Sequence, residues 1–379
     1  ASFSGDYFGR AGELRQLVEF AHPLREGQFA VVAYVFGEAG IGKSRLSYEL
    51  RRQIRDAMTV SWFTCQSDQI LRKPFNPFIY LLKNYFEQSP ENTHGRNREL
   101  FEQNFIELQF ELTESKHPEA DAVRREISRT QSVLAAMLGI HYPGSLWEQL
   151  DGRGRYQNGL AAMANLFVAE SLLQPVVIEL EDAHWYDEMS HEFLAQFIRR
   201  AQAYPLLFLA TSRYEDDGSK SYLFKKNVLE ELSIQNVEVD LNFLHPEDLK
   251  AFAEARLGGN LHPELLELLQ RMTQGNPFYI EQMAEYFREA NLLKNNGGLL
   301  QLKNQDVQMN DSVKEIMMAR IDRLSGLVKE TVKAAAVIGR EFELPVLSAV
   351  MAKQEEFIRK NGDMETVLRE QIQTAEKWQ

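Results

Sequence analysis

The sequence contains one glycine-rich loop, at residues 37–44, that fits the pattern G-x-x-x-x-G-K-[ST] at every fixed position. An apolar run of buried-strand length, residues 29–36, comes directly before it. Residues 45–54 come after it and carry apolar side chains four positions apart, as on one face of a helix. Strand, glycine loop and helix in this order are typical of a site that wraps a phosphate chain.

The residue types of this loop predict how it would hold phosphate. Glycines allow the backbone to turn tightly and to point its N–H groups inward, and the helix N-terminus adds a partial positive charge. Lys43 can reach the β- and γ-phosphates, and the Ser44 hydroxyl can bind Mg²⁺. We therefore expect ATP or ADP with Mg²⁺ as cofactors. The expected nucleotide-binding residues in this segment are Gly37, Glu38, Ala39, Gly40, Ile41, Gly42, Lys43, Ser44 and Arg45.

A second chemical element follows about 140 residues later, where an apolar run ends in the adjacent carboxylates Glu181 and Asp182. A site that hydrolyses a nucleotide needs one acid to hold Mg²⁺ and another to orient the attacking water. Glu181 fits the metal position and Asp182 the water position, but aspartate is more frequent at the first, so the division of roles stays open. His184 follows closely and suits either a hydrogen-bonding role or a proton carrier.

Two shorter motifs complete the pattern. Phe8-Gly9-Arg10 stands shortly before the glycine loop, and Gly275-Asn276-Pro277 makes a turn that starts an apolar helix. In this order, the motifs resemble those of the STAND branch of AAA-like P-loop ATPases. The resemblance implies that Phe8, Gly9, Arg10 and Pro277 lie near the bound nucleotide.

The same resemblance implies a sensor for the γ-phosphate at the end of the apolar run 205–213, where Ser212 or Arg213 would take that role. A salt-bridged surface arginine is the alternative for Arg213, and a plain helix cap is the alternative for the Gly-Asn-Pro turn. The expected catalytic residues are Lys43, Glu181, Asp182 and Arg213, and the expected metal ligands are Ser44 and Glu181.

The resemblance also implies a domain order. Residues 1–242 would form an α/β P-loop NTPase core, a parallel sheet covered by helices, with a mostly helical insertion at about 66–150. Residues 243–308 would form an all-α lid, and residues 309–379 the start of a winged-helix domain that is truncated here. We expect the natural protein to continue into an effector domain.

Composition restricts the function classes. The net charge of −13 and the pI of about 5.3 disfavour broad nucleic-acid binding. The single cysteine, Cys65, rules out an internal disulfide and suits a reducing cytoplasm. No apolar stretch reaches the ~18 residues of a membrane span. The eight histidines show no HExxH pattern and no clustering with cysteine, so a protein-bound zinc site is not expected.

The function expected from these features is an ATP-binding and ATP-hydrolysing switch within a larger signalling or regulatory protein, working with a protein partner or in a self-oligomer. One alternative is a non-catalytic interaction module that keeps nucleotide for structure. Another is a DNA-loading ATPase of the replication-initiator kind, against which the negative net charge counts.

Overall fold

Two units make up the part of the chain that the structure describes. The structure is a computed structural model and describes residues 6–67, 74–215, 217–303, 326–338, 344–351, 368, 369 and 372. Of these, the first unit contains residues 10–39 and 43–241. The second contains residues 6–9, residues 40–42 and those from 242 onward.

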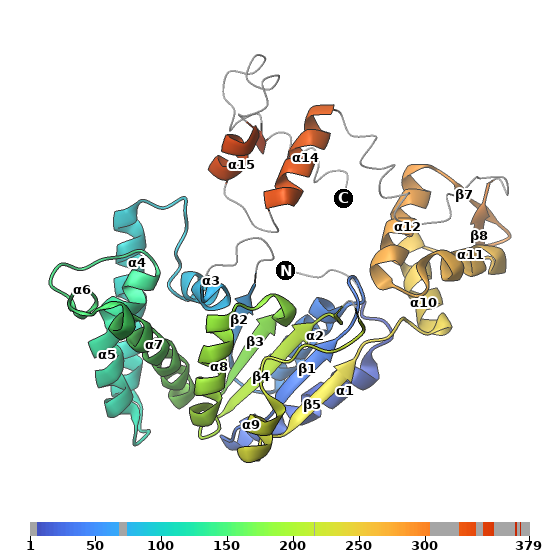
Figure 1. The fold of residues 1–379 in the computed structure, drawn as a ribbon. Coiled ribbons are helices and arrows are strands. Elements are labelled where there is room, and N and C mark those ends of the chain that lie inside the picture. The colour runs from blue at the N-terminus through green and yellow to red at the C-terminus, as the bar shows by residue number, and fades with distance from the viewer. Residues whose placement is uncertain are drawn as a thin grey trace. The chain divides into compact units, whose positions relative to one another are not determined.

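The first unit is built on a sheet of five strands in the order β2-β3-β4-β1-β5 (Figure 1). All neighbouring strands are parallel, which confirms the predicted parallel sheet. Every residue of β1 and β4 is buried, as expected for central strands of a parallel sheet, which are mostly apolar because helices cover both faces of the sheet. The strands are β1 (Val32–Phe36), β2 (Ser61–Gln66), β3 (Val176–Glu181), β4 (Leu206–Ser212) and β5 (Asn236–Asp240).

Helices surround this sheet, and five of them, α3 to α7, lie between β2 and β3 in the chain. Thr93 begins α4 by accepting the Arg96 N–H (3.2 Å), and Asp151 begins α7 by accepting the Gly154 N–H (2.7 Å). The α-helices of the unit are α1 (Ala11–Phe20), α2 (Lys43–Ala57), α3 (Asn76–Tyr85), α4 (His94–Glu114), α5 (Ala120–Met137), α6 (Leu146–Gln149), α7 (Gly152–Leu173), α8 (Glu188–Ala201) and α9 (Lys226–Glu231); η1 (His22–Glu26) and η2 (Ala183–Trp185) are 3₁₀ helices.

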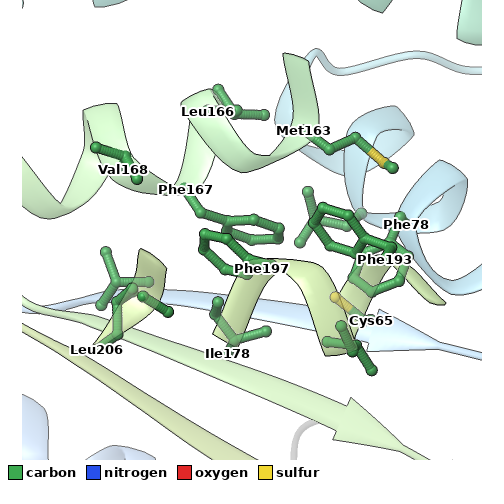
Figure 2. Packing of buried hydrophobic residues seen from close by; sticks show 14 of the residues in the cluster. Cys65, Phe78, Met163, Leu166, Phe167, Val168, Ile178, Phe193, Phe197 and Leu206 are labelled. Carbon is green, nitrogen blue, oxygen red and sulfur yellow. The ribbon is translucent and has the colours of Figure 1, made fainter. Parts of the chain in front are cut away.

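An aromatic core fills the space between one face of the sheet and helices α3, α7 and α8 (Figure 2). The Phe78 and Phe193 rings meet edge to face with their centroids 4.7 Å apart, and Phe197 stacks on Phe193. Ile178 of β3 belongs to this core. Because side chains alternate along a strand, Glu179 next to it points to the opposite face, which α2 covers.

The second unit combines helices with a small sheet of order β6-β8-β7. The expectation of an all-α lid at residues 243–308 is therefore wrong for this sheet. The turn between β7 and β8 is a two-residue loop, Gly297-Gly298, with φ of +61° and +87°, values that glycine adopts readily. The elements are α10 (Pro246–Leu257), β6 (Asn260–Leu261), α11 (Pro263–Thr273), α12 (Pro277–Glu289), β7 (Leu293–Asn296) and β8 (Leu299–Leu302).

Two further helices are described in the C-terminal part, α14 (Gly326–Ile338) and α15 (Leu344–Met351). Leu347, Met351 and Leu368 form a small buried cluster there. Most of the predicted winged-helix segment, residues 309–379, lies outside the described residues, so it stays a prediction. Among the helices that the structure describes, none has the length and apolar character needed to cross a membrane.

Candidate functional site

The ends of strands β1, β3 and β4 meet at the carboxyl edge of the first unit's sheet. Phe36, the last residue of β1, is the register partner of Ser212, the last residue of β4. Directly beyond them, the Gly37 N–H donates to the Ser212 carbonyl (3.2 Å). The Asp182 N–H, just past β3, donates to the Thr211 hydroxyl (3.3 Å). The glycine loop, the acid pair and the sensor segment therefore leave the sheet side by side, although they are far apart in sequence.

Lys43 is the most constrained side chain at this edge. It is the first residue of α2, and its ammonium donates to the carbonyls of Gly37 (2.7 Å) and Glu38 (3.0 Å). Burial and the nearby Arg213 lower the pKa of Lys43 to about 8, while Asp182 and Glu38 oppose that shift. The cations Lys43 and Arg213 and the carboxylates Asp182 and Glu38 thus interact electrostatically around the start of α2. The two cations suit this region to an anion with several charges.

The lowered pKa of Lys43 predicts a pH-dependent affinity for ATP. The charged ammonium attracts phosphate, and the free protein loses this charge as the pH rises above about 8. We therefore expect affinity to be highest below pH 8 and to fall by up to about tenfold per pH unit above it. Titration calorimetry at pH 7, 8 and 9 would measure this. Lys43→Arg is the control, because arginine stays charged over this range and should flatten the profile. A flat profile for the native protein would contradict the interpretation.

The acid pair stands at a sharp bend. Glu181 is the last residue of β3, and Asp182 takes φ +50° and ψ +50°, in the left-handed region that aspartate tolerates better than most residues. The Asp182 carbonyl accepts the Trp185 N–H (2.9 Å), which starts the short helix η2. Because the bend takes Asp182 out of the strand, the two carboxylates are not required to point to opposite faces of the sheet.

His184 connects the acid segment to the sensor segment. Its Nδ1 accepts the Arg213 N–H (3.4 Å) and lies 3.5 Å from the Ser212 hydroxyl. Burial lowers the pKa of His184, as do the charges of Arg213 and Lys43, and Asp182 opposes them. A neutral imidazole that accepts at Nδ1 carries its proton on Nε2. This geometry supports the hydrogen-bonding role for His184 over a proton carrier.

Of the two sensor candidates, Arg213 has the accessible side chain. Ser212 is fully buried, and its hydroxyl donates to the Arg213 carbonyl (3.2 Å). Arg213 is exposed, and its charge acts on Lys43 and His184. Within the described residues, Arg213 forms no ion pair, and its role as the sensor stays a prediction.

Two of the predicted nucleotide-binding residues, Arg45 and Arg10, form ion pairs with other residues of the protein. Arg45 forms an ion pair (2.7 Å) with Glu49, whose side chain is almost completely buried. Arg10 is buried and donates to Glu13 (3.2 Å) at the start of α1. These pairs give Arg45 a structural role within α2 and Arg10 one at the start of α1, and their contact with nucleotide stays a prediction.

The remaining predicted residues of the entry segment and the lid belong to the second unit, as do Gly40, Ile41 and Gly42. The Phe8 ring lies 5.6 Å from that of Phe252, and Gly9, at φ +61°, approaches Asp248 so closely that a Cβ at Gly9 would clash. Pro277 is the first residue of α12, and the Asn276 side chain caps this helix by accepting the Phe278 N–H (3.1 Å).

The residues at the carboxyl edge fit a magnesium–nucleotide complex. Ser44, in the first turn of α2, is exposed, and Glu181 ends β3. Among the residues that the structure describes, no group of three or more His, Cys, Asp or Glu could hold a metal ion. One hydroxyl and one carboxylate suit Mg²⁺, which commonly binds one or two protein oxygens and completes its shell with phosphates and waters.

One residue of this region was not predicted from the sequence. Glu179 lies inside β3, is buried, and accepts hydrogen bonds from Ser47, Trp62 and Thr64. A charged residue within an otherwise apolar strand was the available signal, since such a residue needs partners when it is buried.

Comparison with solved structures finds, among others, three of similar score. The Orc1 protein of Aeropyrum pernix, solved in complex with DNA, is 13% identical with a TM-score of 0.44, over 99% of this chain and 85% of that one. Cdc6p of Pyrobaculum aerophilum is 12% identical with a TM-score of 0.43, over 76% of this chain and 65% of that one. RuvB of Thermotoga maritima is 12% identical with a TM-score of 0.41, over 91% of this chain and 82% of that one. Likeness at this level says nothing about function.

Sequence comparison finds a relative and a family. The chain is 25% identical, over 357 residues, to an uncharacterized protein of Rhizobium meliloti (strain 1021). The match covers 92% of this chain and 31% of that protein, so the chain spans less than a third of the relative's length. The family model described as "AAA ATPase domain" matches residues 7–209, more than half of the 379 residues. The chain belongs to the AAA ATPase domain family.

Proposed function

We propose that this chain binds ATP with Mg²⁺ at the carboxyl edge of the first unit's sheet and hydrolyses it. The observation that carries the proposal is the setting of Lys43. Its buried ammonium is held over the glycine loop, within electrostatic reach of Asp182 and Arg213 from the two neighbouring strand ends. Phosphate is the ligand that such a loop, lysine and helix N-terminus bind together.

The proposal gives each residue a separate task. Lys43 holds the β- and γ-phosphates, and Ser44 and Glu181 supply oxygen ligands to Mg²⁺, which neutralises phosphate charge when it is bound. Asp182 orients the attacking water and accepts its proton. Arg213, held at its backbone by His184, places its guanidinium against the charge that develops on the γ-phosphate.

We further propose that hydrolysis serves as a switch of the STAND type, in which the ATP and ADP states favour different arrangements of the two units. Nucleotide can drive such a change only if the two states differ in their affinity for ATP and ADP. The support is the motif order, with a helix-starting Gly-Asn-Pro turn, residues 275–277, in the second unit.

Protein is the partner class that this proposal favours. With a net charge of −13, long-range attraction to nucleic acid is weak. The Rhizobium relative contains sequence well beyond the matched segment. We propose that the switch controls an output segment of a longer protein, through a protein partner or self-association.

Limited proteolysis of the purified chain tests the switch. The expected result is that ADP and a non-hydrolysable ATP analogue, each with Mg²⁺, give different cleavage rates in the segment joining the units, residues 241–246. Lys43→Ala is the control and should cleave at one rate with either ligand. If the native chain binds both nucleotides yet cleaves identically with each, the switch is wrong while the ATP site remains. A DNA mobility shift at physiological salt would instead favour a DNA-loading ATPase.

A further inference from the structure

The buried carboxylate of Glu179 lies at the centre of a hydrogen-bond network that joins three elements of the first unit. The Trp62 indole N–H (2.7 Å) and the Thr64 hydroxyl (3.1 Å), both on β2, donate to its Oε2. The Ser47 hydroxyl, on α2, donates to its Oε1. Glu179 is only 6% exposed. Burying a carboxylate is costly unless its oxygens are bonded, so these donors hold its position firmly.

The charge of this carboxylate also acts on α2. The Arg51 guanidinium, one helical turn after Ser47, lies over the Trp62 ring, 5.8 Å from the ring centroid. Burial lowers the pKa of Arg51, and the negative charge of Glu179 opposes that shift. Glu179 therefore attracts the same helix at two successive turns, through the Ser47 hydroxyl and through the Arg51 charge.

The position of this contact relates it to the nucleotide site. Ser44 precedes Ser47 by three helical residues, about 4.5 Å along α2 toward its N-terminus. Glu181 follows Glu179 by two strand residues, about 6.6 Å along β3 toward the same edge, and on the same face of the sheet. Since α2 begins at the carboxyl edge where β3 ends, the contact between Ser47 and Glu179 sets how Ser44 and Glu181 lie relative to each other.

We propose that Glu179 is a positioning residue that fixes the register of α2 against β3, and thereby the spacing of the Ser44 hydroxyl and the Glu181 carboxylate for Mg²⁺. This inference rests on the proposed ATP site. Glu179 contacts neither nucleotide nor metal in this account and acts only through these two residues. The loop amides and Lys43 do not depend on that spacing in the same way, so nucleotide binding without metal should be largely independent of Glu179.

The test is Glu179→Gln in the full chain, with ATP affinity measured in EDTA and over a Mg²⁺ titration. Glutamine keeps the shape but removes the charge, and its amide nitrogen, which takes the place of one carboxylate oxygen, cannot accept the hydrogen bonds made at that oxygen. Changes to residues that orient metal ligands typically cost 10- to 100-fold in metal affinity. We expect the Mg²⁺ concentration for half-maximal tightening of ATP binding to rise about tenfold, and the affinity in EDTA to change by no more than about twofold.

Glu170→Gln is a matched control. Glu170 on α7 is also a buried carboxylate, 8% exposed, and it also accepts two hydroxyl hydrogen bonds, from Tyr85 (2.5 Å) and Ser61 (3.2 Å). Ser61 is the first residue of β2, at the end of the strand away from the carboxyl edge. Glu170→Gln should lower the thermal stability about as much as Glu179→Gln does, and it should leave the Mg²⁺ requirement for ATP binding unchanged.

The outcomes distinguish a structural role of Glu179 from a positioning role, and they separate both from a failure of the proposed ATP site. If Glu179→Gln behaves as Glu170→Gln does, with lower stability and an unchanged Mg²⁺ requirement, Glu179 is only structural and the inference is overturned. If Glu179→Gln does not fold, Ser47→Ala removes the hydrogen bond between Glu179 and α2 and keeps both β2 donors. The same rise in the Mg²⁺ requirement is then expected of Ser47→Ala. If the native chain binds no ATP, or binds it equally with and without Mg²⁺, the proposed site itself fails and the inference fails with it.

Discussion

Replacement of Lys43 with alanine is expected to weaken ATP binding by about 100- to 10,000-fold. The ammonium that donates to the Gly37 and Glu38 carbonyls is the group that we propose binds the β- and γ-phosphates. Hydrogen bonds to charged groups contribute roughly 1.5 to 3 kcal/mol each, so the loss of two costs about 3 to 6 kcal/mol. Each 1.4 kcal/mol corresponds to about tenfold in affinity. Titration calorimetry with ATP and Mg²⁺ measures this loss directly.

The loss should not arise from unfolding. Burial lowers the pKa of Lys43, so the folded chain gains little from keeping this charge, and we expect the melting temperature of Lys43→Ala to stay within a few degrees of the native value. Lys226→Ala is the control for charge, because Lys226 is a highly exposed lysine on α9 and should bind ATP normally. Native affinity in Lys43→Ala would reject the loop as the phosphate site.

Replacement of Asp182 with asparagine is expected to slow ATP hydrolysis by about 100- to 1,000-fold while ATP affinity changes by less than about threefold. General-base catalysis typically contributes a factor of 10² to 10⁴, and an amide cannot take the proton from the attacking water. Asparagine also tolerates the left-handed backbone of this position (φ +50°), so the bend after β3 is preserved. Phosphate release under single-turnover conditions, with bound ATP measured in parallel, separates the two effects.

The matched variant Glu181→Gln decides how the two acids divide their roles. If Glu181 is the metal ligand, its replacement raises the Mg²⁺ requirement for tight ATP binding, and Asp182→Asn leaves that requirement unchanged. If instead Asp182→Asn raises the Mg²⁺ requirement and Glu181→Gln leaves it unchanged, Asp182 is the metal ligand and Glu181 orients the water. Unimpaired hydrolysis in both variants would mean that neither carboxylate takes part in the chemistry.

Much of the first unit's fold could be predicted from the sequence because its three central strands, β3, β4 and β1, are buried on both faces over almost their whole length. The apolar runs at residues 29–36 and 205–213, and the one that ends at Glu181, correspond to β1, β4 and β3 to within a few residues. The glycine loop has a fixed spacing, and Lys43 lies where that spacing implies, at the first turn of a helix. Patterns of this kind depend on local chemistry, so one sequence is enough to recognise them.

Features that depend on contacts between distant segments could not be predicted. Glu179 looks like an interruption of an apolar strand, and only the fold brings Ser47 and Trp62 to it. The role of His184 was left open because its partner, the Arg213 N–H, follows a different strand. The small sheet of the second unit was missed because its strands have two to four residues each, too short for alternation to show, although the Gly297-Gly298 turn was a usable signal.

The most direct test of the nucleotide site is to count adenine nucleotide per chain. The purified protein is denatured and any released nucleotide is identified by chromatography, and a second sample is first saturated with ATP and Mg²⁺. The account predicts one adenine nucleotide per chain after saturation, whether the protein is purified empty or already holding ADP, and none retained by Lys43→Ala. If the native chain releases no nucleotide and also binds none at millimolar ATP, the carboxyl edge of this sheet is not an ATP site.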